Sequence, residues 1–479
     1  MKSNRKEFLK KVGLSGLGIA GASITGWTDK TKGQGQSSEL RQLHKPRRQH
    51  FNMSGYAAPG IDTVGVGFIG LGNRGPTHLA NAILFEGVEV NGICDIRPEK
   101  IAEAQEMIKD TSHEPEVYTD DTNAWKKMCD RDDIDLVFIA TPWDWHVPMA
   151  VYAMEQGKHV AIEVPAATTI EECWQLVETS ERTRKHCIML ENCCYGFFEL
   201  LTLNMARQGY FGDIIHGEGA YIHDLLGLNF SKEGYWKMWR LRENIGRDGN
   251  LYPTHGLGPV CQIMDVNRGD QMDYLTSMSS DDFSMEKTAQ KLAKEDNFYA
   301  KYTHKSYRGN MNTTTVRTKK GRTIMIQHDV SSPRVYSRIH LVSGTDGSAR
   351  KYPGPPRIAT DHRGWLSEQE FKDVQEKYRP SIVKQMGQMA KEVGGHGGMD
   401  FLMDWRLIDC IRNGLPLDMD VYDAALWSAI SPLSEWSVAN RSNSIDVPDF
   451  TAGSWKTNEP LDMGLQQEGS TKAYSALVK

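Results

Sequence analysis

The chain has 479 residues, with 56 Lys and Arg against 62 Asp and Glu, and therefore a formal net charge of −6. Its 39% hydrophobic and 25% charged content is typical of a soluble globular protein, and its length favours two domains. The negative balance argues against nucleic acid or an anionic membrane as the main partner, and no apolar run past the first thirty residues is long enough to span a bilayer. The eight Cys residues are too sparse for a disulfide scaffold. These bounds favour an enzyme or binder of small molecules.

The first thirty residues have the pattern of an export signal. A basic start is followed by a short, glycine-rich, weakly apolar stretch. Residues 4–10 (NRKEFLK) resemble the twin-arginine motif, except that Lys6 follows Arg5 where a second Arg belongs. We expect residues 1–30 to direct export to the periplasm, and a non-functional signal would leave the protein in the cytoplasm. Residues 31–60 are expected to form a linker or arm.

The first domain begins with a strand, a turn and a helix. An apolar, β-branched run at 63–69 leads into GLGNRG at 70–75, and Pro76 then opens a helix with apolar residues at helical spacing. The glycines permit a tight turn and let a pyrophosphate approach the backbone N–H groups at the helix N-terminus. This is the GxGxxG pattern in the context that it needs, and it predicts a dinucleotide site.

The acid that follows the second strand indicates which dinucleotide binds. The strand at 88–94 ends at Asp95, 20 residues beyond Gly75. A carboxylate at this place binds the ribose 2′-hydroxyl of NAD and repels the 2′-phosphate of NADP, although Arg97 close by leaves some room for NADP.

Strands continue to alternate with helices up to about Gly209. The expected strands are 134–140, 159–163 and 187–191, and the expected helices are 149–156 and 169–185. This alternation predicts an α/β Rossmann domain with a doubly wound parallel sheet over residues 61–209.

A different pattern follows. Segments with polar alternation at 214–221, 312–317, 323–329 and 337–343 are typical of antiparallel strands. We expect residues 210–455 to form an α+β substrate domain with a large open antiparallel or mixed sheet, and residues 456–479 to form a polar C-terminal tail. Such a sheet could bury itself against another copy, so a homo-oligomer is possible.

Three motifs of the first domain carry a family resemblance. The turn at 70–75, Thr141-Pro142 and Glu163-Val164-Pro165 resemble the glucose-fructose oxidoreductase and inositol dehydrogenase superfamily. Most members have Lys where this chain has Val164, close to the reacting hydroxyl. The departure removes the usual proton acceptor for simple hydride transfer.

Four longer motifs resemble a narrower family. They are EVPAA at 163–167, ENCCYG at 191–196, YPTHGLGPV at 252–260 and GHGGMDF at 395–401. They are similar to glycoside hydrolase family 109, which contains NAD-dependent α-N-acetylgalactosaminidases and in which twin-arginine signals are common. The resemblance runs from about Gly65 to the region of Trp455.

The resemblance implies a retaining glycosidase that keeps NAD through turnover. The hydroxyl on carbon 3 is transiently oxidised, the proton on carbon 2 leaves, the aglycone is eliminated from carbon 1, water adds and the ketone is reduced again. The net reaction is hydrolysis of terminal α-N-acetylgalactosamine on a glycan, and the hard chemistry belongs to the cofactor. An ordinary glycosidase would instead need two carboxylates beside the glycosidic bond. No metal is expected, because ligand spacing for one is not evident.

The family's site residues are carried over by position. The implied NAD contacts, with the glycines of the turn, are Gly70, Gly72, Asn73, Arg74, Asp95, Trp143, Asp144, Trp145, His146, Glu163, Val164, Asn192 and Tyr252. The implied sugar contacts are Tyr221, Arg240, Tyr252, Pro253, Thr254, His255 and Tyr336. We expect His255 and Tyr252 to transfer protons, with Tyr221 in reserve. A tyrosine can serve only if its pKa falls below the usual value of about 10.

Several of these residues also have a purely structural interpretation. His146 could simply begin a helix, Glu163 could close a strand, and His255 could be a satisfied core histidine. The roles of Tyr336 and Arg240 could fall to nearby residues, namely Tyr302, Tyr307, Arg242 and Arg338. His396 could line the pocket or lie in a tight glycine loop at 394–398. The adjacent Cys193 and Cys194 are expected to be buried small residues rather than nucleophiles.

Three functions remain open at this point. The first is the NAD-retaining glycosidase. The second is an NAD-dependent sugar or polyol dehydrogenase of the wider superfamily, against which Val164 argues. The third is a sugar-responsive binder that keeps NAD as structure, against which the tyrosines and His255 argue. The exact sugar and its linkage stay open.

Overall fold

The computed structural model describes residues 47–119 and 121–474. The predicted export signal at 1–30 and the first part of the predicted arm at 31–60 lie outside these residues. Within the described ranges, no helix is both long and apolar enough to cross a membrane.

The first domain is built on a six-stranded parallel sheet with the strand order β3-β2-β1-β4-β5-β6. Its strands are β1 (Val64–Ile69), β2 (Val88–Cys94), β3 (Glu116–Tyr118), β4 (Leu136–Ile139), β5 (His159–Ile162) and β6 (Cys187–Met189). Its helices are α3 (Gly75–Ala82), α4 (Pro98–Ile108), α5 (Ala124–Cys129), α6 (His146–Glu155) and α7 (Ile170–Thr183). The order reverses between β1 and β4, and the predicted doubly wound Rossmann sheet is confirmed.

The second sheet has eight strands in the order β13-β12-β11-β7-β10-β9-β8-β14. They are β7 (Ile214–Ile222), β8 (Met272–Ser279), β9 (Asn312–Thr318), β10 (Thr323–Asp329), β11 (Leu341–Gly344), β12 (Ser348–Arg350), β13 (Arg357–Ala359) and β14 (Ile445–Asp446). Neighbours are antiparallel except β10 and β7, which are parallel, so the sheet is mixed. Association of copies through this sheet stays a prediction.

One predicted strand is too long. The expected strand at 337–343 is reduced to β11, which begins at Leu341. Ile339 and His340 have φ angles of 59° and 35°, in the left-handed region that an extended strand cannot contain. Ser337 is therefore joined to the sheet only by an isolated bridge to Ile222.

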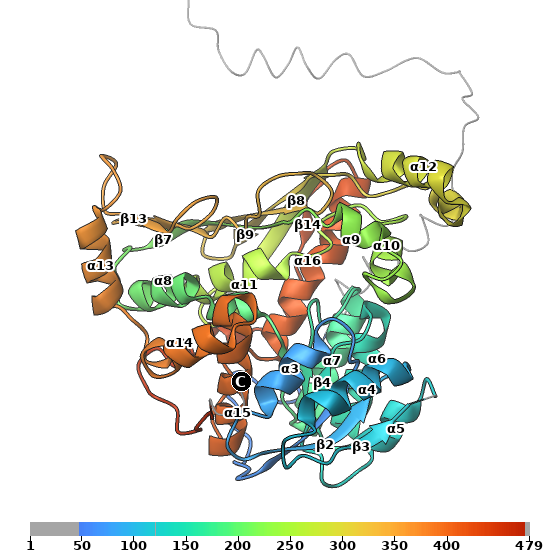
Figure 1. The fold of residues 1–479 in the computed structure, drawn as a ribbon. Helices are drawn as coiled ribbons and strands as arrows, with labels where there is room; N and C mark the ends of the chain where they lie inside the picture. Colours follow the sequence, from blue (N-terminus) through green and yellow to red (C-terminus); the bar gives the residue numbers. More distant parts are fainter. Residues whose placement is uncertain (1–46, 120, 475–479) are drawn as a thin grey trace, which may run out of the picture. The chain divides into compact units, whose positions relative to one another are not determined.

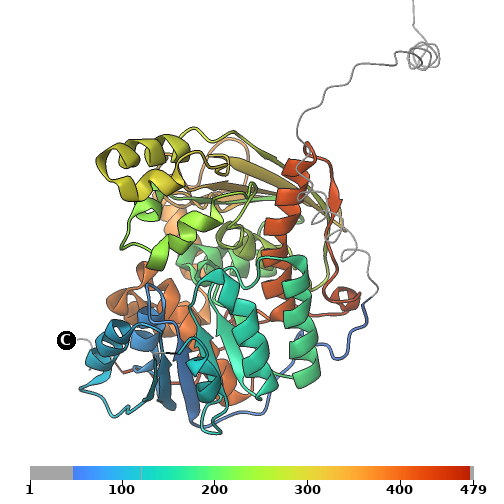
Figure 2. The same ribbon diagram turned by 90° about the vertical axis from the view of Figure 1, so that its right-hand side faces the viewer.

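Helices from the second half of the chain pack against the Rossmann domain (Figure 1). The helix α15 (Met399–Asn413) lies beside α3 and β1, although it belongs to the predicted substrate domain. The helix α16 (Val421–Ala439) lies between α7 and β8, and Figure 2 shows it running alongside α7. The two domains therefore share a continuous core rather than meeting only at a cleft.

The described parts of both terminal segments lie against this core. In the arm, the side-chain amide of Gln49 donates to the Tyr422 hydroxyl at 2.7 Å, and the backbone N–H of His50 donates to Glu181 at 2.7 Å. Near the other end, the backbone N–H of Thr471 donates to Asp409 at 3.0 Å, and Met463 is buried. These contacts hold parts of residues 456–474 against the core, although their sequence is polar.

Candidate active site

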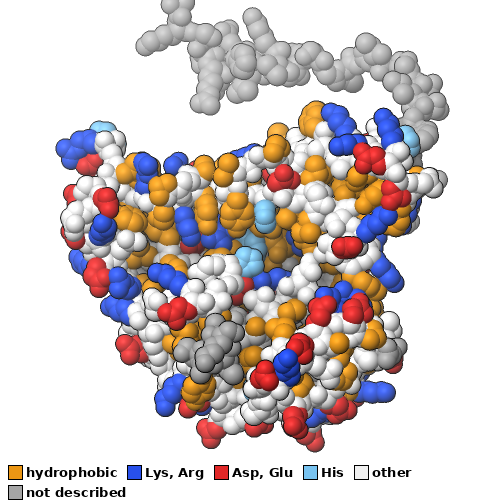
Figure 3. All heavy atoms as spheres, in the orientation of Figure 1, with side chains coloured by type: hydrophobic (Ala, Val, Ile, Leu, Met, Phe, Trp, Pro, Cys, Tyr) orange, Lys and Arg blue, Asp and Glu red, His pale blue; other side chains and the backbone are white. Residues whose placement is uncertain are grey.

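A cavity of about 390 Å³ opens where the Rossmann strands end and the second sheet faces them. Figure 3 shows the hollow, with histidine side chains inside it. The cavity is lined by these predicted site residues: Gly70, Gly72, Asn73, Arg74, Asp95, Trp143, Trp145, His146, Glu163, Val164, Asn192, Tyr221, Arg240, Tyr252 and His255. The predicted NAD and sugar residues therefore meet in one place, as the switch point of the sheet requires. Their individual roles stay predictions.

Four predicted residues are not part of this lining. Asp144 is exposed but does not line the cavity. Pro253 and Thr254 are buried and do not line it either. Tyr336 is 37% exposed, and its ring lies 5.0 Å from that of His223, which does line the cavity. Of the alternatives, Arg242 and Tyr302 line a separate groove, and Arg338 is buried against Glu199.

The dinucleotide end of the cavity fits NAD. Gly70 has φ of 90°, and a Cβ there would lie 2.7 Å from the carbonyl oxygen of Ala140, so only glycine is tolerated at the turn. The helix α3 has no side-chain cap, which leaves its first N–H groups for a phosphate. Asp95 lines the cavity at the end of β2, where it accepts from the backbone N–H of Leu71 at 2.8 Å and from Arg97. The remaining acceptor sites of its carboxylate can bind a ribose hydroxyl.

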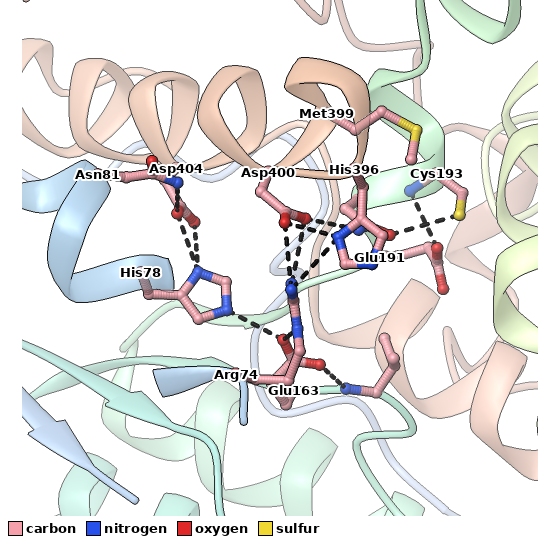
Figure 4. A network of polar contacts seen from close by, with 12 residues as sticks. Arg74, His78, Asn81, Glu163, Glu191, Cys193, His396, Met399, Asp400 and Asp404 are labelled. Carbon is pink, nitrogen blue, oxygen red and sulfur yellow. Dashed lines mark hydrogen bonds and ion pairs between the residues drawn. The ribbon is translucent and has the colours of Figure 1, made fainter. Parts of the chain in front are cut away.

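Arg74 lies at the centre of a polar network that joins the two domains (Figure 4). Its guanidinium donates to Glu163 at 2.7 Å and to both carboxylate oxygens of Asp400 at 3.1 Å. Burial by itself would raise the pKa of Glu163, but the charges and hydrogen bonds of Arg74 and His78 hold it well below its usual range. Arg74 therefore faces the cavity and orients Glu163 directly. It also orients Asn192 through Asp400, because the Asn192 amide donates to Asp400 at 2.6 Å.

His78 extends this network into the core. Its two ring nitrogens lie 2.9 Å from Asp404 and 3.0 Å from Glu163, and the side chain is fully buried. Arg74 and His78 are four residues apart in the chain, and so are Asp400 and Asp404. Two basic groups at one helical turn of spacing therefore face two acidic groups where α3 packs on α15. Burial by itself would lower the pKa of His78, but the charge and hydrogen bonds of Asp404 raise it to about 9.

This pKa predicts a pH-dependent contribution to stability. The folded value of about 9 lies above the unfolded value of about 6.5, so the imidazolium stabilises the fold fully below pH 6.5 or so, and the gain is lost as the pH rises through about 9. We expect His78→Gln to destabilise the protein most at about pH 6 and least at about pH 10. Thermal unfolding of both proteins across this range measures the gap, and a gap independent of pH would contradict the assignment.

The end of the cavity where the sequence predicts nicotinamide contacts is framed by backbone carbonyls. The Trp143 indole donates to the carbonyl of Val164 at 3.2 Å. Both nitrogens of His146 face carbonyls, those of Pro165 at 2.9 Å and Thr141 at 2.8 Å. His146 is the first residue of α6, as the interpretation of this residue as a helix start predicts. Its two contacts join the loop at Thr141 to the loop at Pro165.

His255 forms a buried pair with a carboxylate that the sequence analysis did not predict. Its Nδ1 lies 2.7 Å from Oε1 of Glu191, whose side chain is fully buried at the end of β6. Burial alone would raise the pKa of Glu191, but the charge and hydrogen bond of His255 lower it. A carboxylate in this position fixes the tautomer of the ring and stabilises its protonated form, as in other His–carboxylate pairs. His255 is therefore equipped to accept a proton.

Two tyrosines complete the wall around His255. The rings of Tyr221 and Tyr252 lie 5.2 Å and 4.9 Å from the His255 ring, and 4.7 Å from each other. Burial raises the pKa of Tyr252 well above 10 and that of Tyr221 in the same direction. The lowered pKa that a proton-accepting tyrosine needs is thus not found here, and both hydroxyls are suited to donate hydrogen bonds.

A half-buried cation completes this part of the cavity. The Arg240 guanidinium lies 4.5 Å from the Trp143 ring centroid and 4.4 Å from that of Tyr252. Cation–π contacts of this kind hold the guanidinium between aromatic faces, with its N–H groups available to a polar ligand.

Glu191, Cys193 and His255 form a group whose potential ligand atoms lie within 4.8 Å of one another. However, the Arg338 guanidinium donates to the Cys193 sulfur at 2.8 Å. A second cation beside this guanidinium would be repelled, so the group is better suited to proton chemistry than to binding a metal.

Four residues in or behind the cavity wall were missed or left open by the sequence analysis. Glu191 and Asp400 act from behind the lining, and His223 accepts or donates a 3.0 Å hydrogen bond with the Tyr221 hydroxyl. His396 lines the cavity and lies 2.7 Å from Asp400. All five residues from Gly394 to Gly398 have positive φ, which explains why four of them are glycine.

Comparison with known proteins matches both halves of the chain. Residues 64–191 match an oxidoreductase family with an NAD-binding Rossmann fold, and residues 195–457 match the C-terminal domain of glycosyl hydrolase 109. An α-N-acetylgalactosaminidase of Bacteroides fragilis is 51% identical over 419 residues, which cover 86% of this chain and 97% of that protein. A glycosyl hydrolase family 109 protein of Shewanella pealeana is 45% identical and covers 96% and 99%.

Solved structures share the fold at low identity. A levoglucosan dehydrogenase in complex with NADH matches with a TM-score of 0.62 and 19% identity, covering 81% of this chain and all of the other. An NAD-binding oxidoreductase from Klebsiella pneumoniae matches with the same TM-score and 15% identity. These two matches support the two-domain fold alone.

Proposed function

This chain belongs to glycosyl hydrolase family 109, and we therefore propose that it is an NAD-dependent retaining glycosidase that removes terminal α-N-acetylgalactosamine from glycans. The observation that carries the proposal is the His255–Glu191 pair, which faces the same cavity as the dinucleotide turn. A proton acceptor next to a dinucleotide site suits a route by oxidation and elimination. Among the described lining residues, Glu163 is engaged by Arg74 and His78, so it is not free to act as one of two opposed carboxylates.

NAD, when bound, supplies reversible oxidation of the hydroxyl on carbon 3, which acidifies the proton on carbon 2. We assign the removal of that proton to Nε2 of His255, with Glu191 stabilising the imidazolium. Tyr221 and Tyr252 remain protonated and donate hydrogen bonds to sugar oxygens, so we assign them orientation rather than proton acceptance. Arg240 donates to a hydroxyl or to the acetamido oxygen. Val164, where related dehydrogenases have Lys, cannot accept the hydroxyl proton that carbon 3 loses on oxidation, so we assign that proton to water in the cavity, which returns it when the ketone is reduced.

One assay tests this function against the dehydrogenase alternative. Purified protein is given a chromogenic α-N-acetylgalactosaminide with no added nicotinamide. The proposal predicts steady chromophore release with no accumulation of NADH. Release of NADH in proportion to sugar consumed would favour a dehydrogenase, and binding without turnover would favour a non-catalytic protein.

Glu191 is predicted to act as a positioning residue. Glu191→Gln keeps the size of the side chain but removes the charge that stabilises protonated His255, so we expect kcat to fall about 10- to 100-fold with KM little changed. Bound NAD should stay at the wild-type level. Glu191→Asp, which keeps the charge, should recover part of kcat. A rise in KM or a loss of NAD in Glu191→Gln would instead indicate a structural role.

We also propose that residues 1–30 direct export of the folded, NAD-loaded protein, on the basis of the basic and glycine-rich pattern around Arg5 and Lys6. Expression with the native N-terminus should place the activity in the periplasm. Replacing both basic residues with Gln should retain it in the cytoplasm. Equal distribution of the two forms would contradict the proposal.

A further inference from the structure

A second groove, of about 780 Å³, lies beside the active-site cavity. We call it the basic groove. It is lined by Lys232, Lys237, Met238, Arg242, Ile245, Phe298, Lys301, Tyr302 and Lys305. Five of these nine side chains are cations, all five are exposed, and none of the nine is acidic. This concentration of positive charge contrasts with the net charge of −6 of the whole chain.

Little of this charge is neutralised by the protein. Lys232 pairs with Asp296 at 2.5 Å. Among the described residues, no carboxylate lies within ion-pair distance of Lys237, Arg242, Lys301 or Lys305, and the nearby Glu286 accepts from backbone N–H groups of residues 304 and 305. The clustered cations therefore repel one another, and a bound anion would reduce this repulsion.

The cations are held in place by aromatic rings. The ammonium groups of Lys232 and Lys301 lie 4.4 Å and 4.1 Å from the Phe298 ring centroid. Cation–π contacts favour this arrangement and place two like charges at one ring.

One short segment separates the basic groove from the active-site cavity. In η3 (Trp236–Met238) and α10 (Trp239–Glu243), Trp236, Trp239 and Arg240 line the cavity, whereas Lys237, Met238 and Arg242 line the groove. The Lys237 ammonium lies 4.3 Å from the centroid of the Trp236 ring. A positive charge therefore stands at the rim shared by both hollows.

The same segment is strained. Lys237 and Met238 have φ of 50° and 54°, although neither is glycine. The left-handed region is unfavourable for residues other than glycine, and strain of this kind collects at ligand clamps. Here it directs Lys237 and Met238 to the groove while their neighbours face the cavity.

We propose that the basic groove binds a sulfate ester or carboxylate on the glycan to which the terminal sugar is attached. This inference rests on the proposed function, because the groove lies next to the cavity that would hold the terminal sugar. The Arg242 guanidinium can bind such a group through two N–H donors, and the lysines add charge-assisted hydrogen bonds. The net charge of −6 of the whole chain disfavours long polyanions such as nucleic acid.

The test compares substrates that differ only in charge beyond the scissile bond. Three oligosaccharides end in the same α-N-acetylgalactosamine, and their next sugar is neutral, sulfated or carboxylated. For the wild-type holoenzyme we expect kcat/KM to be about tenfold higher for at least one anionic substrate than for the neutral one at low salt, and the advantage to shrink at high salt. The two anionic arms show which group the groove prefers.

Charge reversal in the groove provides the matched comparison. The double variant Lys301→Glu, Lys305→Glu should lose the anionic preference while its kcat/KM for the neutral substrate stays within about twofold of wild type. The control variant Lys127→Glu, Lys384→Glu, which reverses two exposed lysines elsewhere, should keep the preference. Equal kcat/KM for all three substrates in the wild type would overturn the proposal, as would retention of the preference in the groove variant.

Binding is also measured without turnover. Calorimetry with a sulfated oligosaccharide that lacks the terminal sugar should show binding to the wild type and none to the groove variant. If the sulfated oligosaccharide binds in this way while no substrate is hydrolysed, the groove proposal is supported and the proposed function is contradicted. If the neutral substrate is hydrolysed while no anionic glycan binds, the groove proposal fails alone. Equally tight binding of single-stranded DNA would overturn the assignment to a glycan.

Discussion

His255→Ala is expected to lower kcat by about 10²- to 10⁴-fold while NAD remains bound. The variant removes an imidazole that lines the cavity and pairs with the buried carboxylate of Glu191. The other cavity imidazole with such a partner, His396, shares Asp400 with Arg74. Tyr221 and Tyr252 beside it are not suited to accept the proton from carbon 2 in its place, because burial raises their pKa values. The measurement is exchange of deuterium into carbon 2 during turnover, together with the NAD content of the purified protein.

A surface histidine serves as the control for this substitution. His362 is exposed on the loop before α13 (Glu368–Lys377), so His362→Ala should leave exchange and NAD content at wild-type levels. If His255→Ala exchanged carbon 2 as fast as the wild type, the proton would have to be carried by another group, and His223 or His396, which also line the cavity, would become the candidate.

Asp400→Asn is expected to weaken both the fold and the retention of NAD. Asp400 is buried and accepts hydrogen bonds from Arg74 and Asn192, with His396 at 2.7 Å. Burial by itself would raise its pKa, but His396 and Arg74 hold that pKa well below the usual range. Removing one partner of a buried ion pair costs about 3 kcal/mol or more. The loosened Arg74 should also disturb the dinucleotide turn that precedes α3.

The urea midpoint at saturating NAD and the NAD content after gel filtration report these two effects. Glu103→Gln is the matched control, because the same chemical change is made in an exposed pair with Lys100 at 2.6 Å. Such pairs contribute about 1 kcal/mol or less. If Asp400→Asn were no less stable than Glu103→Gln, the network between α3 and α15 would contribute nothing to the folded state.

The first domain was predictable from the sequence because its signals are local. The strand β1, the glycine turn and α3 follow each other within 20 residues, and the acid at Asp95 lies at a fixed spacing beyond them. The strand β3 and the helix α5 were not predicted, since segments of three and six residues are too short to show a period.

The interface between the domains could not be predicted in this way. Asp400 and Asp404 lie more than 300 residues from Arg74 and His78, and nothing near them in the sequence indicates a basic partner. Glu191 was within a recognised motif, but only the fold shows that it lies behind His255 rather than in the cavity lining. The available signal was a carboxylate at the end of an apolar strand, one residue before the predicted site residue Asn192.

The pKa of the tyrosines depends on burial, and burial depends on tertiary packing. The sequence predicted Tyr252 as a proton carrier on the condition of a lowered pKa. The fold instead surrounds Tyr252 with Trp143, Tyr221 and His255, and the loss of water raises the pKa. The hydrogen-bond donor role follows from this packing.

The central claim is that hydrolysis proceeds through loss of the proton on carbon 2, and turnover in deuterium oxide tests it most directly. The wild-type protein, with no added nicotinamide, should release N-acetylgalactosamine that carries deuterium at carbon 2, as seen by mass spectrometry and NMR. Release of the sugar with hydrogen fully retained at carbon 2 would contradict the account, because a direct displacement at carbon 1 never breaks that bond.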